Sequence, residues 1–132
     1  MGINEILLID CRKEDGEQKI NKILWKIKPI KQKMIKLGYQ KDDIVPIVQL
    51  EKFLQFVRIK YGYRTQWVNT YYEIDKTINK TKFVFYTHGL VDEKDKWITN
   101  VEGRTLWELF AKTAIVFYDK IKKSEKEGDE QC

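Results

Sequence analysis

The residues that could carry catalytic chemistry are few. The chain of 132 residues contains one histidine, His88, which precedes Gly89 at the end of a β-rich run. A lone histidine can act as a general base, but no serine, cysteine or second histidine lies at a recognisable spacing from it. The cysteines, Cys11 and Cys132, are isolated, which favours a reducing cytoplasm and argues against a metal site. We therefore expect His88 to be a structural or surface residue.

Acidic pairs are the other candidates for catalysis. Glu73 and Asp75 would share one face of a strand, and Asp92, Glu93 and Asp95 follow each other closely. Hydrolases use such pairs as acid and base, but these lie beside turns and lysines, as solvated loop charges do. The seven glycines form no phosphate-binding pattern. We predict a protein that is not an enzyme, with no metal and no cofactor.

The basic residues are the strongest signal. The formal charge is +5 and the pI about 9.1. Residues 1–43 and 44–66 each carry +3, whereas residues 67–132 carry −1. Between Gln18 and Gln40 there are seven lysines and no acid. As candidate binding residues we select two patches: Lys19, Lys22, Lys26 and Lys33 on one helix face, and Arg58, Lys60, Arg64 and Trp67 further along.

Such a surface could attract phosphates, an acidic protein surface or anionic lipid. The alternative is a solvated helix face on which lysines extend their charged ends into water. Lysine dominates over arginine, and lysine makes fewer contacts of fixed geometry, which weakens a role in reading bases.

Aromatic residues gather in the second half of the chain, where Trp67, Tyr71, Tyr72, Phe83 and Phe85 occupy both phases of predicted strands. One face of the sheet would then be buried and the other partly exposed. An exposed aromatic face could stack bases or form the centre of a protein interface, and it is compatible with a homodimer. Alternatively, the N-terminal helical segment covers it.

Most of the predicted elements are clear. Residues 4–11 suit either a helix or a buried strand, with a preference for helix. Residues 18–37 have a helical period that Pro29 should kink or split, and Gly38 should end it. A second helix should follow Pro46 and end at Gly62.

Strands are predicted over residues 65–74, 82–88 and 97–101, with a charged loop at 92–96. Thr105 and Glu108 form a capping box for a last helix. Residues 124–132 carry no apolar anchor and should be flexible.

These elements predict an α+β fold. An N-terminal basic helical segment (residues 1–43) precedes an α-β-β-β-α unit (residues 44–123) with a three-stranded antiparallel sheet, and both helices of the unit lie on one face. Residues 1–123 would form a single domain, followed by a charged flexible tail (124–132). No apolar run approaches the roughly 18 residues of a membrane span, and the N-terminus lacks a signal-peptide pattern.

The C-terminal third carries a family resemblance. A short strand meander ends in the pattern G-(K/R)-T-x-x-E-x-x-A-K-x-A-I, formed by Gly103, Arg104, Thr105, Glu108, Ala111, Lys112, Ala114 and Ile115. Over residues 65–123 the chain resembles small accessory proteins of phages and prophages of low-GC Gram-positive bacteria, and it is similar to the phage α-β-β-β-α sandwich domains. The resemblance implies a small protein that acts by binding in the cytoplasm of the bacterial host.

The element order is also similar to that of double-stranded-RNA-binding domains. At the position where those domains grip phosphate, this chain offers Arg104 and Lys112, with Glu102 and Glu108 close by.

From the phage resemblance we expect a non-catalytic, phage-encoded binding protein that inhibits or modulates a host or defence protein complex, in the manner of anti-CRISPR proteins. That target could be a nucleoprotein complex. The alternative is a nucleic-acid-binding phage accessory or regulatory protein. A small-metabolite binder, with tryptophan and tyrosine as stacking walls, stays open as a third reading.

Overall fold

The computed structural model describes the backbone of residues 2–78 and 80–131, and the side chains of residues 2–66, 69–70, 76–78 and 85–126. Helices and strands are mixed in one chain, so the α+β prediction is confirmed. The elements in chain order are α1 (Ile3–Leu7), α2 (Gly16–Leu24), α3 (Lys28–Lys36), α4 (Ile47–Tyr61), β1 (Arg64–Asp75), β2 (Lys80–Val91), β3 (Trp97–Gly103) and α5 (Leu106–Gln131).

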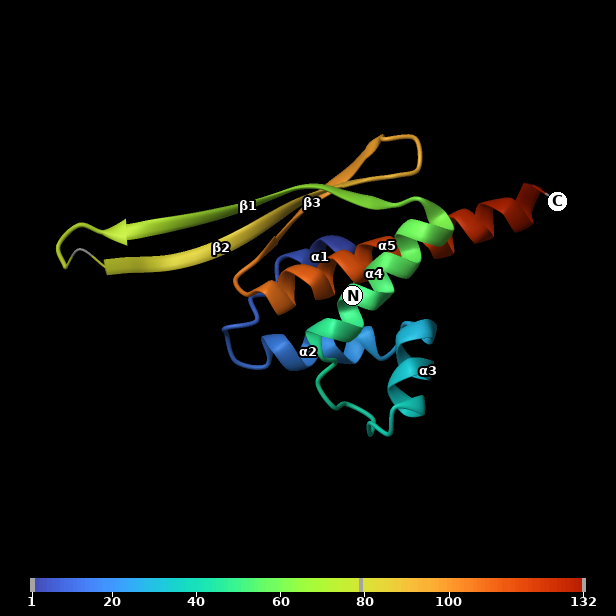
Figure 1. Ribbon diagram of the computed structural model, residues 1–132, viewed down its shortest axis with the longest axis horizontal. Coiled ribbons are helices and arrows are strands. Elements are labelled where there is room, and N and C mark those ends of the chain that lie inside the picture. The colour runs from blue at the N-terminus through green and yellow to red at the C-terminus, as the bar shows by residue number, and fades with distance from the viewer. Residues whose placement is uncertain (1, 79, 132) are drawn as a thin grey trace.

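The three strands form an antiparallel meander in the order β1-β2-β3, as predicted. All three are longer than the sequence pattern indicated. β3 pairs only with the Tyr86–Val91 part of β2, whereas β1 pairs along the whole of β2. The β1–β2 hairpin therefore continues past β3 as a two-stranded arm, which projects from the helical body in Figure 1.

The described helices lie on one side of the sheet (Figure 1). α5 is the central one, because it contacts β2 and β3 on one side and α1, α2 and α4 on the other. The N-terminal segment thus packs against α5. Our alternative reading, in which it covers the aromatic face of the sheet, stays a prediction, because the side chains of Trp67, Tyr71, Tyr72 and Phe83 lie outside the described residues.

Pro29 divides the N-terminal helical region, as predicted, but the break precedes it. α2 ends at Leu24, and α3 starts at Lys28 with Pro29 in its first turn. Proline is tolerated there because that N–H has no partner within a helix. Gly38, with φ +92°, follows the end of α3, and Gly62, with φ +78°, caps α4; both positions favour glycine.

The segment around residues 4–11 is helical at Ile3–Leu7, so the preference for helix is confirmed there, although Gly2 and not Asn4 is the N-cap. Its one buried side chain, Ile6, joins the core. That core is continuous through the helices and the sheet, and its fully enclosed members include Ile20, Leu24, Met34, Leu50, Leu90, Val101, Leu109 and Phe117.

The predicted capping box at the start of α5 is half formed. The Glu108 N–H donates to Thr105 Oγ1 at 3.1 Å. The Glu108 carboxylate does not return to Thr105; it accepts from the backbone N–H groups of Cys11, at 2.5 Å, and Arg104. α5 then runs to Gln131, well past the predicted helix end at 123. The flexibility of residues 124–132 stays a prediction.

Candidate functional site

Four concave regions bring the predicted basic residues together with others. The first, which we name the lysine groove, has a volume of about 810 Å³ and lies between α2 and α3. It exists because the chain turns between these helices at residues 25–27, so that lysines from the two helices face one space. Its lining consists of Lys22, Trp25, Lys26, Lys28, Lys31, Ile35, Lys41 and Asp42.

A buried asparagine fixes the loop that closes the lysine groove. Asn21 is 1% exposed; its side-chain amide donates to the carbonyls of Asp42 and Asp43, and its oxygen accepts from the Val45 N–H at 3.0 Å. The Trp25 indole N–H also donates to the Asp43 carbonyl, at 2.8 Å. These bonds hold the 41–45 segment against α2 and place Lys41 opposite the helix lysines.

The lysine groove is strongly positive. Among the described residues, no carboxylate lies within 4 Å of any of its five lysine ammonium groups, so their charges are not neutralised by ion pairs. Asp42 is the acidic residue in the lining. Like charges held this close raise each other's energy and favour an anionic partner.

The second region is a smaller apolar pocket on the other side of α3. It has a volume of about 230 Å³ and lies between α3 and α4. Its lining is Pro29, Ile30, Lys33, Gln49, Lys52, Phe53 and Phe56. Phe56 is 41% exposed, and Gln49 Oε1 is buried with no hydrogen-bond partner among the described residues. The pocket therefore offers an apolar wall and two flanking lysines.

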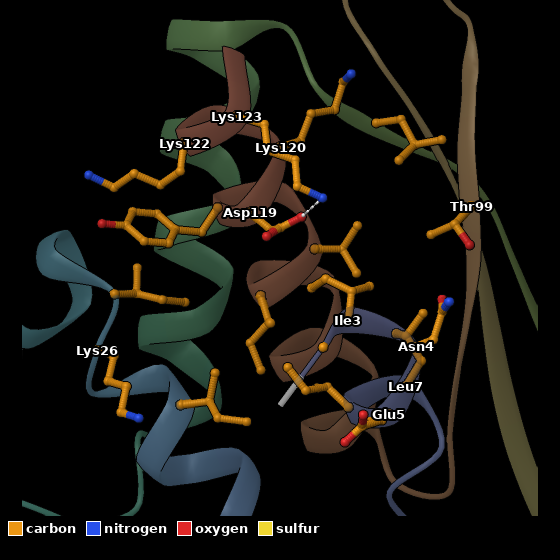
Figure 2. Close-up of a pocket in the computed structure, with 18 of the residues that line it drawn as sticks. Ile3, Asn4, Glu5, Leu7, Lys26, Thr99, Asp119, Lys120, Lys122 and Lys123 are labelled. Atoms are coloured by element: carbon orange, nitrogen blue, oxygen red, sulfur yellow. Dashed lines mark ion pairs between the residues drawn. The ribbon is translucent and has the colours of Figure 1, made fainter. Parts of the chain in front are cut away.

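The third region, the α1–α5 groove, has a volume of about 1010 Å³ and is lined by α1, β3, α5 and the turn after α2. Figure 2 shows Ile3, Leu7 and Thr99 on one side, with Lys26 and the lysines of α5 on the other. Lys123 pairs with Asp119 at 3.0 Å. Lys26 lines both this groove and the lysine groove, which joins the two basic surfaces.

The fourth region, the His88 cavity, has a volume of about 580 Å³ and lies where α4 and α5 meet the start of β1 and the end of β2, with Asp95 contributed by the loop before β3. Arg58 and Arg64 line it together with His88. Arg64 forms an ion pair with Asp95. His88 is 2% exposed, and burial lowers its pKa to about 4, so it is neutral at physiological pH.

The structure distributes the residues of each predicted patch over different regions of the surface. Of the first, Lys22 and Lys26 share the lysine groove, Lys33 lines the apolar pocket, and Lys19 is exposed and lines none of these four regions. Of the second, Arg58 and Arg64 share the His88 cavity. Lys60 lies over the rings of Phe56 and Tyr61, at 5.6 and 5.4 Å from their centroids. Trp67 pairs with Gly89 through its backbone, and its side chain lies outside the described residues.

Sequence reasoning missed three lysines of the groove: Lys28, Lys31 and Lys41. All were visible as charges, but a helical wheel drawn through residues 18–37 places Lys28 and Lys31 on other faces. The break before Pro29 was the signal that could have found them, because two separate helices can turn different faces toward one space.

Lys112, one of the two cations that we expected at a phosphate-gripping position, is buried instead. It is 3% exposed and its ammonium donates to the carbonyls of Leu7 and Ile9, at 3.0 and 2.5 Å. It also lies 3.7 Å from the Glu108 carboxylate, which is itself 1% exposed. Burial lowers the pKa of Lys112. This pair ties the N-terminal segment to α5 and is not available to a ligand.

Comparisons of the chain with protein-family models, with curated proteins and with solved structures gave no match. Within the described residues, no three His, Cys, Asp or Glu side chains gather where they could share a metal ion. Among the helices of the described part, none combines the length and apolar character that a membrane-spanning segment needs.

Proposed function

We propose that this protein is a non-catalytic binding protein that docks a partner protein on α3 and thereby inhibits or modulates a host or defence protein complex. The observation that carries the proposal is the pairing of two surfaces on one nine-residue helix. The lysine groove lies on one side of α3 and the apolar pocket on the other. The link to a phage and its host rests on the sequence resemblance described above.

The chemistry of the two surfaces specifies the partner. Protein interfaces combine a small apolar centre with a polar or charged rim. Here Phe53 and Phe56 supply the apolar centre, and the lysines on both sides of α3 supply the rim. The matching partner is an acidic protein surface that presents an apolar side chain to the pocket.

The alternative function is direct nucleic-acid binding, and the lysine groove itself favours it, since it is lined by five lysines that have no ion-pair partner among the described residues. Five phosphate contacts predict that affinity falls roughly 10²–10³-fold between about 50 and 200 mM salt. A phosphate backbone makes no use of the apolar pocket. The two functions therefore differ in their response to salt and to an apolar substitution.

The test uses three variants of the tagged protein. Lys22→Glu/Lys31→Glu reverses charge in the lysine groove, and Phe56→Ser removes an aromatic wall of the apolar pocket. Lys19→Glu is the matched control, because Lys19 is an exposed lysine that lines none of the four regions. Each is used to capture partners from a lysate of a low-GC Gram-positive bacterium, with and without nuclease, at low and moderate salt. All variants must first show the circular dichroism of the folded parent.

The proposal expects one discrete protein partner that survives nuclease and moderate salt. This partner should be lost with both Phe56→Ser and the double lysine variant and kept with Lys19→Glu. Captured nucleic acid that disappears with salt and is indifferent to Phe56→Ser would replace the proposal with the alternative. A partner that all three variants retain would place the interface elsewhere.

A further inference from the structure

The α1–α5 groove is the largest of the four concave regions, and the function proposed above does not use it. Its volume of about 1010 Å³ lies at the upper end of the range for small-molecule sites, about 300–1,000 Å³. Four segments enclose it: the single turn of α1, the end of α2 with the turn that follows, the start of β3, and the face of α5 between residues 115 and 124. Segments far apart in the sequence therefore build one site.

The apolar part of the groove is aliphatic. Eight isoleucine, leucine and valine side chains line it: Ile3, Ile6, Leu7, Ile23, Ile27, Ile98, Ile115 and Val116. Four of them are only 2–5% exposed and belong to the core. The other four, two from α1, one from α2 and one from β3, are half-buried and pack against that core. Their remaining apolar surface is in contact with water, so a ligand that covers it gains hydrophobic free energy.

The composition of the lining favours a small aliphatic ligand over a protein partner. Protein interfaces are enriched in tryptophan, phenylalanine, methionine and arginine and depleted in lysine. Among the described residues that line the groove there is none of the four enriched types, whereas four are lysines. Tyr118 is the one aromatic residue in this part of the lining. A flexible hydrocarbon chain fits such walls better than a planar ring or a protein side chain does.

Three of the four lysines in the lining are available to an anion. Lys123 pairs with Asp119 at 3.0 Å. Among the described residues, no carboxylate lies within 4 Å of the other three ammonium groups, which are those of Lys26, Lys120 and Lys122. Glu5 is the remaining carboxylate in the described lining, so four lysines face two carboxylates. This excess of positive charge favours an anionic group.

The aliphatic side chains and the lysines occupy different parts of the groove. Along α5 the lining changes from Ile115 and Val116 to Lys122 and Lys123, and a rise of about 1.5 Å per residue separates the two pairs by about 10 Å. Figure 2 shows the lysines of α5 across the groove from Ile3. The groove is therefore amphipathic in the same sense as a molecule with a hydrocarbon chain and one anionic end.

We propose that the α1–α5 groove binds one long-chain acyl anion, the chemical class of the fatty acids. The hydrocarbon chain lies on the aliphatic side formed by α1, β3 and Ile115, and the carboxylate pairs with Lys122 and its neighbours on α5. The groove shares Lys26 with the lysine groove, but the proposal needs no residue of α3. It can therefore fail or succeed without bearing on the partner docked there.

Isoleucine methyl groups are direct probes of the groove. Protein labelled with ¹³C at the isoleucine δ-methyl groups is titrated with laurate, below the concentration at which laurate forms micelles. The methyl resonances of Ile3, Ile23 and Ile98 should shift in a saturable way. Ile59, which is 78% exposed on α4 and outside the groove, should stay in place. In a series of laurate, decanoate and octanoate, each loss of two methylene groups should weaken binding roughly tenfold to fifteenfold.

The Lys120→Gln/Lys122→Gln variant tests the contact with the carboxylate. The loss of these two cations should weaken the binding of decanoate about threefold to tenfold and leave the binding of uncharged decanol unchanged. Lys19→Gln/Lys126→Gln is the matched control, because these two exposed lysines line none of the four concave regions. All four positions lie in helices, where glutamine is well tolerated.

Four results would overturn the proposal. The methyl groups of the groove do not shift, or Ile59 shifts in parallel with them, or affinity does not depend on chain length, or the two double variants weaken binding equally. Vesicles of phosphatidylglycerol form the last arm of the experiment. Binding to vesicles without binding of monomeric laurate would replace the acyl-anion site by a membrane-binding surface.

Discussion

Acid should destabilise this protein through His88. The side chain is 2% exposed, and burial lowers its pKa from 6.5 to about 4. The other charged groups that line its cavity are Arg58, Arg64 and Asp95. In the unfolded chain the imidazole is solvated and takes up a proton near its ordinary pKa. Between about pH 6.5 and pH 4 the unfolded state therefore binds more protons than the folded state.

The size of the effect follows from the two pKa values. A folded pKa below the unfolded one means that the free energy of unfolding decreases as pH falls through the interval between them. With values of 6.5 and about 4, His88 contributes almost no pH dependence at about pH 7. It costs about 2 kcal/mol at pH 5 and about 3 kcal/mol at pH 4. Below the folded pKa the loss levels off.

The assay is urea unfolding of the wild type and of His88→Gln at about pH 7, 5 and 4. Glutamine does not titrate, whereas every carboxylate is present in both proteins. The difference between the two free energies of unfolding therefore isolates His88. We expect the variant to be the less stable protein at neutral pH and the gap to shrink by about 3 kcal/mol at pH 4.

Two curves that stay parallel from about pH 7 to 4 would refute the reasoning, because they would show equal proton uptake by His88 in both states. If His88→Gln does not fold, the wild type still supplies the answer. Its single histidine can be titrated by NMR, and a midpoint near 6.5 in the folded protein would contradict the buried, neutral imidazole.

Three further outcomes are expected. Glu108→Ala should lower the free energy of unfolding by about 3–5 kcal/mol, since it leaves the buried Lys112 ammonium without its carboxylate partner. Thr105→Ala should lower it by about 1 kcal/mol. Equal losses in urea unfolding would contradict the buried pair. Gly103→Ala should cost roughly 1–3 kcal/mol, because its Cβ would lie 2.5 Å from the Leu109 nitrogen, while Gly2→Ala, with open space around it, should leave the melting temperature unchanged. Burial, and then the neighbouring carboxylate, raise the pKa of the Cys11 thiol. Iodoacetamide should therefore label Cys11 much more slowly in the native protein than in urea, as read by peptide mass spectrometry, and equal rates would refute this.

Much of the fold follows from local sequence rules. The strand meander, the helix after Pro46 and the start of α5 were all predicted from periodicity and from residues that end elements. What the sequence could not supply was the placement of the N-terminal helices. Their apolar stripes require burial, but a stripe does not specify which surface buries it. In this protein the surface of α5 buries these stripes, because α5 is apolar on more than one side.

The candidate sites were less predictable than the elements. Lys22 and Lys26 were selected because they lie on one face of a predicted helix. The groove that they line depends on the turn after α2, which brings Lys28 and Lys31 opposite them. For Lys112 the prediction was wrong in the opposite sense, because a residue expected to bind is buried. It looks like an exposed cation on a helical wheel, but its long side chain reaches three backbone carbonyls of other segments. Only tertiary contacts distinguish these cases.

The described interior leaves few polar atoms without partners. Among the described residues three buried side-chain atoms have no hydrogen-bond partner: Gln49 Oε1, Thr87 Oγ1 and His88 Nε2. Elsewhere the interior is well satisfied, even at Asn21 and Lys112. Unpaired buried groups are rare in folded proteins because each costs free energy. Two of the three line concave regions, Gln49 in the apolar pocket and His88 in its own cavity. Each of these atoms has less than 1 Å² of accessible surface, so the neighbouring space does not reach it. The case for the apolar pocket therefore rests on its apolar wall and its two flanking lysines, and not on the unpaired amide oxygen.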